Sequence, residues 1–133
     1  MKEKLVDLLE AYPLPEKKEV PPYKIYCDMD GVLTDFEKRF DHFTGMNPQE
    51  YEKAYGTEQF WHLIDTKIGV RFWVGMDWMP EGQRLWDFIS PYKPDLLTSP
   101  SRHNSSRLGK NLWVRNNLTP KPKTIFAYSA DKQ

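Results

Sequence analysis

Short apolar runs and longer amphipathic segments alternate along the chain. The apolar runs are β-prone and bounded by charged or turn-forming residues, so we predict strands there. They cover residues 23–27, 95–98 and 123–128. Segments with helical spacing separate them. The order strand, helix, strand, helix, strand predicts an α/β fold with a parallel sheet and right-handed crossovers.

The segment after the first strand is helical, aromatic and without clear strands. Thr34 or Asp35 can cap a helix that runs to Gly45, and Pro48 lies in the first turn of the next helix. The helical stretch 36–78 is too long for a simple crossover. We therefore predict a helical cap inserted after the first strand.

Two further helices complete the pattern, over residues 80–89 and 104–118. The second is expected to turn Leu108, Leu112 and Trp113 inward. The whole chain then divides into an N-terminal helix with a proline-rich linker, a core in two pieces, and the cap. The boundaries are 1–22 for the first part, 23–35 and 79–133 for the core, and 36–78 for the cap.

Composition narrows the class of protein. The 133 residues suit one domain, and 39% are hydrophobic, which is too many for a disordered chain. The 19 basic and 19 acidic residues balance, so a nucleic acid polymer is not an expected partner. No segment approaches the ~20 apolar residues of a membrane span, and the N-terminus does not resemble a signal peptide. We expect a cytoplasmic protein whose single cysteine, Cys27, is buried and inert.

Polar side chains follow the predicted strands at their carboxyl ends. Asp28 and Asp30 come after the first strand, Thr98 and Ser99 after the second, and Lys132 after the third. Ligands of open parallel sheets bind at this edge. The sequence therefore predicts a binding site there.

Two aspartates one residue apart bring negative charge to a partly desolvated place, which a cation would offset. Mg²⁺ suits Asp28 and Asp30, because it takes one or two carboxylates together with substrate phosphate oxygens and water. A carboxylate can also attack phosphorus. Gly31 permits a tight turn that brings backbone N–H groups towards a phosphate. The alternative is an ordinary turn, in which Asp-x-Asp-Gly is common.

The stretch Asp28-Met-Asp-Gly-Val-Leu-Thr-Asp-Phe36 resembles the first motif of haloacid dehalogenase (HAD) superfamily phosphatases, and more narrowly that of 5′(3′)-deoxyribonucleotidase-like members. The resemblance implies a HAD-like Rossmannoid core. It also implies that Asp28 is the nucleophile and a Mg²⁺ ligand. Asp30 would be the general acid and base, and would bind Mg²⁺ through its backbone carbonyl.

Later residues extend the resemblance. Leu96-Leu-Thr-Ser-Pro100 matches the second motif, in which Thr98, with Ser99 beside it, binds the phosphate. The third motif is a lysine that steadies the nucleophile and the phosphoryl charge. Lys132 is its expected counterpart, and Lys110, on the preceding helix, is the alternative.

The aromatic residues of the cap leave two interpretations open. Phe72 and Trp73 precede the return to the core much as an aromatic pocket does in the deoxyribonucleotidases, and they could stack on a nucleobase. Alternatively they form the core of the cap itself. Phe36 and Phe40 carry the same two interpretations.

The family continues with another strand ending in an acidic pair, whereas this sequence ends at Gln133. The strand at 23–28 is then expected at the sheet edge, where it would pair with another copy or be covered by residues 1–22. We expect a Mg²⁺-dependent phosphomonoester hydrolase acting on 5′-nucleotides or similar small phosphate esters. The alternative is a phosphate- or nucleotide-binding module with weak or no turnover, either a fragment of a longer enzyme or a natural short form.

Overall fold

The computed structural model describes residues 24–101 and 103–128. They form an α/β arrangement whose sheet has three parallel strands in the order β1-β2-β3. The strands are β1 (Tyr26–Cys27), β2 (Asp95–Thr98) and β3 (Thr124–Phe126). This confirms the predicted class and the parallel sheet. The predicted N-terminal helix and linker over 1–22 lie outside the described residues.

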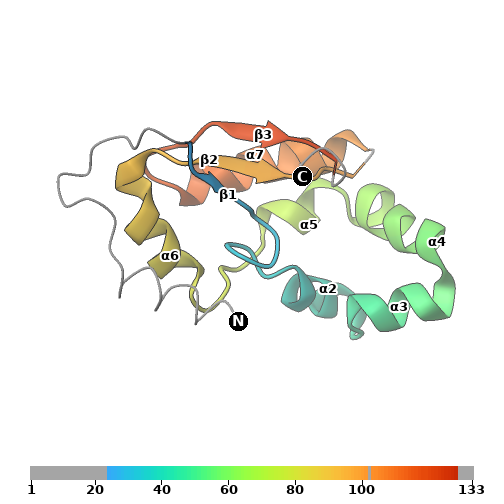
Figure 1. Ribbon diagram of the computed structural model, residues 1–133. Helices are drawn as coiled ribbons and strands as arrows, with labels where there is room; N and C mark the ends of the chain where they lie inside the picture. The colour runs from blue at the N-terminus through green and yellow to red at the C-terminus, as the bar shows by residue number, and fades with distance from the viewer. Residues whose placement is uncertain (1–23, 102, 129–133) are drawn as a thin grey trace.

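Helices fill the connections between the strands. Between β1 and β2 the chain forms α2 (Phe36–Thr44), α3 (Pro48–Tyr55), α4 (Thr57–His62), the π-helix η1 (Leu63–Ile68), α5 (Val70–Val74), α6 (Gly82–Ile89) and the 3₁₀-helix η2 (Ser90–Tyr92). A long helix, α7 (Asn104–Asn117), connects β2 to β3. Figure 1 shows α2, α3 and α4 together beyond the arrowheads of β2 and β3, so the helical insertion lies at the carboxyl end of the sheet.

Local sequence explains where the first helices begin and end. The Asp35 carboxylate accepts a hydrogen bond from the backbone N–H of Lys38 at 3.1 Å and so caps α2. The helix stops at Gly45, whose φ of +72° is a left-handed conformation that favours glycine. Asn47 caps α3 in the same way as Asp35 caps α2, and Pro48 occupies its first turn. The predicted start and end of α2 and the predicted start of α3 are confirmed.

The core is continuous from the cap into the sheet. Phe40, Phe60 and Phe72 pack ring against ring among the cap helices, while Leu96 of β2 and Trp113 of α7 belong to the same buried cluster. Burying several aromatic side chains in this way supplies much of the hydrophobic stabilisation of so small a cap. The cap and the sheet are therefore packed on one core.

The inward face of α7 differs from the prediction. Trp113 is buried as expected, but Leu108 is 53% exposed, so its predicted inward position is wrong. The buried face instead carries Ser106, Gly109 and Lys110. A side chain at Gly109 would place its Cβ 2.5 Å from the Cβ of Trp73, so glycine allows α7 and α5 to approach closely.

Within the described sheet, β1 pairs with β2 alone, so β1 lies at its edge. The prediction that residues 1–22 cover this edge falls outside the described residues. Across residues 24–101 and 103–128, no helix combines the length and apolar character that crossing a bilayer requires.

Candidate functional site

The loop after β1 is a compact turn that fixes both aspartates. The carbonyl of Met29 accepts hydrogen bonds from the backbone N–H groups of Val32, Leu33 and Thr34 at 2.8 to 3.1 Å. Gly31 has a φ of +79°, which a glycine adopts without strain. The turn interpretation of Asp-x-Asp-Gly is thus correct for the backbone, and the two carboxylates project from that turn.

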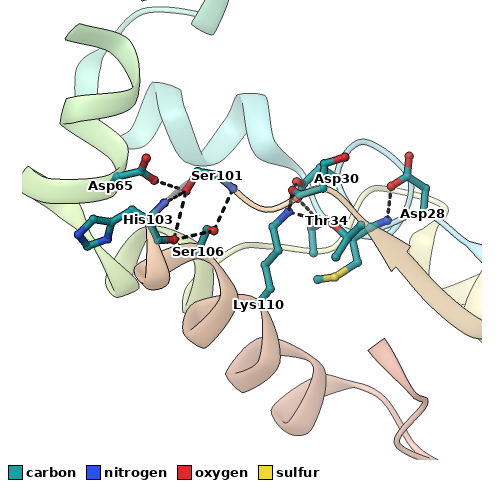
Figure 2. A network of polar contacts seen from close by, with 11 residues as sticks. Asp28, Asp30, Thr34, Asp65, Ser101, His103, Ser106 and Lys110 are labelled. Carbon is teal, nitrogen blue, oxygen red and sulfur yellow. Dashed lines mark hydrogen bonds and ion pairs between the residues drawn. The ribbon is translucent and has the colours of Figure 1, made fainter. Parts of the chain in front are cut away.

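The two carboxylates have different surroundings. Asp28 is exposed, and its Oδ1 accepts a hydrogen bond from the backbone N–H of Met29 at 2.9 Å. Asp30 is partly buried, and its Oδ1 accepts from the Thr34 hydroxyl at 3.0 Å. Figure 2 shows both carboxyl groups on the same side of the loop, with Asp30 next to Lys110 and Asp28 beyond it.

Lys110 connects the predicted motifs. Its ammonium group donates three hydrogen bonds, to Asp30 Oδ2 at 3.0 Å, to Thr98 Oγ1 at 2.9 Å and to the backbone carbonyl of Ser99 at 2.7 Å. The side chain is 1% exposed, and Nζ lies 4.8 Å from the ring centroid of Trp73. Three acceptors match the three N–H bonds of an ammonium, so this buried charge is fully satisfied.

The structure therefore brings Asp30, Thr98 and Ser99 together, as the sequence predicted. The lysine at their centre is Lys110, which the sequence analysis named as the alternative. Lys132 lies outside the described residues. The spacing of Lys110 three residues before the buried Trp113 was the signal that it faces inward.

Other predicted site residues have different roles here. The N–H of Gly31 donates to the carbonyl of Thr34 at 2.8 Å, so it holds the turn. Phe72 is 0% exposed and Trp73 is 2% exposed. Other aromatic rings, together with Lys110 and Gly109, cover their surfaces. Of the two interpretations of these rings, the structure supports the core.

A pocket of about 490 Å³ opens beside the lysine cluster. It has a cap wall and a core wall, and is lined by Asp30, Trp61, Asp65, Ser99, Pro100, Ser101 and Tyr128. A neighbouring pocket of about 370 Å³ shares Asp30 and Trp61 and adds Phe36. Trp61 is 38% exposed, so its indole is an aromatic surface that a ligand can contact. Sequence reasoning overlooked Trp61, which follows the buried Phe60 in α4.

A separate hollow of about 260 Å³ lies at the amino ends of the strands, where it contains none of the predicted site residues. It is lined by Lys24, Trp86, Ser90, Lys93, Pro94, Asp95, Pro120, Lys121, Pro122 and Lys123. The candidate site is the pocket at the carboxyl ends, because it is lined by Asp30 and Ser99, which the buried Lys110 binds together with Thr98.

Asp28 and Asp30 are suitable ligands for a Mg²⁺ ion that takes few of its ligands from the protein. Asp28 can supply a carboxylate and Asp30 its backbone carbonyl oxygen, and Mg²⁺ commonly binds through one or two carboxylates with substrate phosphate and water. Among the described residues, no group of three or more His, Cys, Asp and Glu side chains is arranged to hold a metal ion. A metal held here would thus rely on substrate oxygens and water for its remaining ligands.

The cysteine before the acidic pair is not part of the site. Cys27 is 5% exposed. Burial raises the pKa of its thiol to about 12, and the negative charge of Asp28 adds to that effect. Because the thiolate is the reactive form, this thiol is inert near neutral pH, as the sequence predicted.

Comparisons with models of protein families, with curated proteins and with solved structures found no match to this chain. The resemblance to HAD phosphatases accordingly remains an expectation carried by residues 28–36 and 96–100. What the chain does is inferred from its residues and their geometry.

Proposed function

We propose that the protein is a Mg²⁺-dependent phosphomonoester hydrolase of the HAD type. The observation that carries the proposal is the buried ammonium of Lys110, which binds Asp30, Thr98 and Ser99 at once. Asp30 lies 80 residues from Lys110 in the chain, so local structure alone does not explain their contact. Two carboxylates, a hydroxyl and a lysine at one sheet edge are the groups that phosphoryl transfer through an aspartate requires.

In the proposed reaction, a carboxylate oxygen of Asp28 attacks phosphorus. The bond between phosphorus and the ester oxygen breaks, and Asp30, in its protonated form once substrate is bound, gives that proton to the departing alkoxide and becomes a carboxylate. An aspartyl phosphate on Asp28 results. Asp30 then takes a proton from a water molecule, whose oxygen attacks phosphorus and releases inorganic phosphate with the Asp28 carboxylate restored.

The remaining groups hold charge and orientation. Lys110 offsets the negative charge of Asp30 and of the phosphoryl oxygens, and Thr98 Oγ1 can donate to one of those oxygens while it accepts from Lys110. Mg²⁺, bound by Asp28 and by the backbone carbonyl of Asp30, would supply further positive charge at the phosphoryl group.

The pocket favours a substrate with a flat aromatic part. Trp61 stands between the two hollows that meet at Asp30, and Phe36 lines the second of them. An indole surface binds a nucleobase by stacking, whichever base it is. We therefore propose 5′-nucleotides or similar small phosphate esters as the substrate class, with Trp61 in the role that the sequence analysis gave to Phe72 and Trp73.

The proposal is tested by measuring phosphate release from deoxynucleoside monophosphates with and without Mg²⁺. Asp28→Asn removes the nucleophile while preserving shape, and we expect it to abolish release. Asp41→Asn is the matched control, because Asp41 is an exposed acid on α2 away from the cluster. Equal release by the wild type and Asp28→Asn would remove Asp28 from the mechanism.

One observation favours a second candidate, a phosphate- or nucleotide-binding module with little turnover. Both carboxylate oxygens of Asp30 already accept hydrogen bonds, one from Thr34 and one from Lys110. Proton transfer by Asp30 requires one of these bonds to be replaced when substrate binds. Calorimetry that detects Mg²⁺-dependent nucleotide binding, with no phosphate released over hours, would favour the binding module.

A further inference from the structure

A second polar cluster joins the cap to the loop that follows β2. It begins at Asp65, in the π-helix η1, where the N–H of Gly69 donates to the carbonyl of Ile64 at 2.8 Å. That five-residue spacing is the π pattern, which is rare and is found frequently at functional sites. Asp65 is half-buried and lines the pocket beside Asp30, one helical turn after Trp61.

Asp65 is held by two serines that belong to the core. The hydroxyl of Ser101 donates to its Oδ1 at 2.6 Å, and the hydroxyl of Ser105 donates to its backbone carbonyl at 3.0 Å. Figure 2 shows the first contact, in which the Asp65 carboxyl group faces Ser101 across the gap between cap and core. A hydroxyl bound to a carboxylate at this distance is a strong, charge-assisted hydrogen bond.

The same serine is fixed from the other side. The N–H of Ser101 donates to Ser106 Oγ at 3.0 Å, and Ser106 Oγ donates to the carbonyl of His103 at 3.2 Å. His103 caps α7 by accepting from the N–H of Ser105 at 3.2 Å. The start of α7 and the residues before it are thus tied together, and Asp65 binds them through two of the serines.

The loop fixed by Asp65 also carries the phosphate-site groups. Ser99, whose carbonyl accepts from Lys110 at 2.7 Å, lies two residues before Ser101. Lys110 itself projects from α7, whose first turn contains Ser105 and Ser106. A displacement of Ser101 would therefore move Ser99, which precedes it in the chain, and the start of α7, which follows it.

The surroundings of Asp65 affect the pKa of its carboxyl group in opposite directions. Burial raises the pKa of its carboxyl group, while the Ser101 hydrogen bond and the nearby His103 oppose that rise. Other titratable groups also face this region, since Glu58, His62 and His103 line the same surface hollow as Asp65. The Ser101 hydroxyl thus stabilises the ionised form of Asp65.

We propose that Asp65 is a positioning residue that fastens the cap to the loop after β2 and so sets Ser99 and Lys110 relative to Asp30. This inference rests on the proposed function for its effect on turnover. The Asp65 carboxylate binds Ser101, whereas Asp30, Thr98 and Ser99 are held by Lys110. Asp65 and Ser101 both line the pocket, together with Trp61 of the cap and Asp30 of the core.

A double-mutant cycle tests the contact in the full chain. Asp65→Ala and Ser101→Ala should each lower kcat for phosphate release by on the order of tenfold or more, because misplaced catalytic groups are costly. The double variant should lose no more than either single one, since both remove the same bond. Asp65→Asn, which keeps an acceptor oxygen, should recover part of the loss. Asp41→Asn serves as the control and should retain wild-type kcat.

Losses that simply add in the double variant, or an unchanged kcat in both single variants, would overturn the proposal. A loss confined to KM would instead assign Asp65 to substrate binding and would also overturn it. Thermal melting identifies any variant that has lost its fold, and Asp65→Asn then takes its place in the comparison.

A measurement without catalysis separates this inference from the proposed function. The pKa of Asp65 can be followed by NMR titration of its carboxyl carbon in the wild type and in Ser101→Ala. Because the Ser101 bond lowers this pKa, its removal should raise it further. If the wild type releases no phosphate, the proposed function fails, while the titration still reports whether the contact exists. An unshifted pKa would refute the contact itself.

Discussion

Replacing Lys110 by methionine is the sharpest test of the candidate site. Methionine keeps most of the buried aliphatic stem and removes only the ammonium group. Three acceptors then lose their donor together, namely Asp30 Oδ2, Thr98 Oγ1 and the carbonyl of Ser99. Asp30 keeps its hydrogen bond from Thr34, so the loop after β1 retains its local structure.

The magnitude follows from burial at the two ends of the ion pair. Removing one partner of a fully buried pair costs ~3–5 kcal/mol, whereas an exposed pair contributes ~0–1 kcal/mol. Lys110 is 1% exposed, but the Asp30 side chain is 30% exposed, so water can solvate the carboxylate left behind. The carbonyl of Ser99 and the Thr98 hydroxyl each lose the hydrogen bond that Lys110 donates. We expect a loss of about 2–4 kcal/mol in the free energy of unfolding.

The assay is urea unfolding of the wild type, Lys110→Met and Lys121→Met, followed by tryptophan fluorescence, together with phosphate release. Lys121 is exposed and lies at the opposite end of the sheet, so its variant should match the wild type in both. Lys110→Met should also lower kcat by roughly 10²–10³, the effect of removing one group that stabilises developing charge. Stability within about 0.5 kcal/mol of the wild type would show that the three hydrogen bonds are absent in solution.

Three further predictions concern other parts of the chain. Gly109→Ala should destabilise the protein by about 1–2 kcal/mol, because the new Cβ would lie 2.5 Å from the Cβ of Trp73. Asn111→Ala, on the exposed face of α7, is the control and should not destabilise it. Thermal melting compares the two variants with the wild type. Trp61→Ala should raise KM for deoxynucleoside monophosphates by about tenfold or more. It should leave the hydrolysis of glycerol phosphate, which has no base, unchanged. Equal effects on both substrates would exclude base stacking on Trp61. With a pKa of about 12, Cys27 should react with iodoacetamide at pH 8 only when urea unfolds the chain, and rapid labelling of the folded protein would contradict its burial.

Much of the fold could be predicted because the signals are local. Asp35 and Gly45 bound α2 through a side-chain cap and a positive φ, both of which are properties of single residues. The parallel sheet followed from the alternation of short apolar runs with helical segments, since parallel strands need such crossovers. The π-helix could not be predicted, because it depends on packing that seats Asp65 against the serines of α7 and its preceding loop.

The site was harder to predict, because it contains a buried lysine and an exposed tryptophan, whereas lysine is usually exposed and tryptophan is usually buried. Lysine is almost never fully buried unless it is paired, so Lys110 is most simply placed in solvent when α7 is considered alone. The inward face of α7 becomes visible only when Trp113 is taken as the buried reference, and positions 106, 109 and 110 then share its face.

The second feature is an exposed aromatic residue, Trp61, where burial is the usual preference. Phe72 and Trp73 are buried in the core, whereas Trp61 is exposed and lines the pocket with Asp30. A cap of this size cannot bury all of its rings, because small domains have too little interior volume for every large side chain. The ring left outside lies one helical turn before Asp65, the residue that contacts Ser101. Binding of an aromatic substrate to Trp61 of α4 would therefore act next to η1, whose Asp65 we propose to position Ser99 and Lys110. Substrate recognition by the cap and the placement of charge in the core are then connected through Asp65.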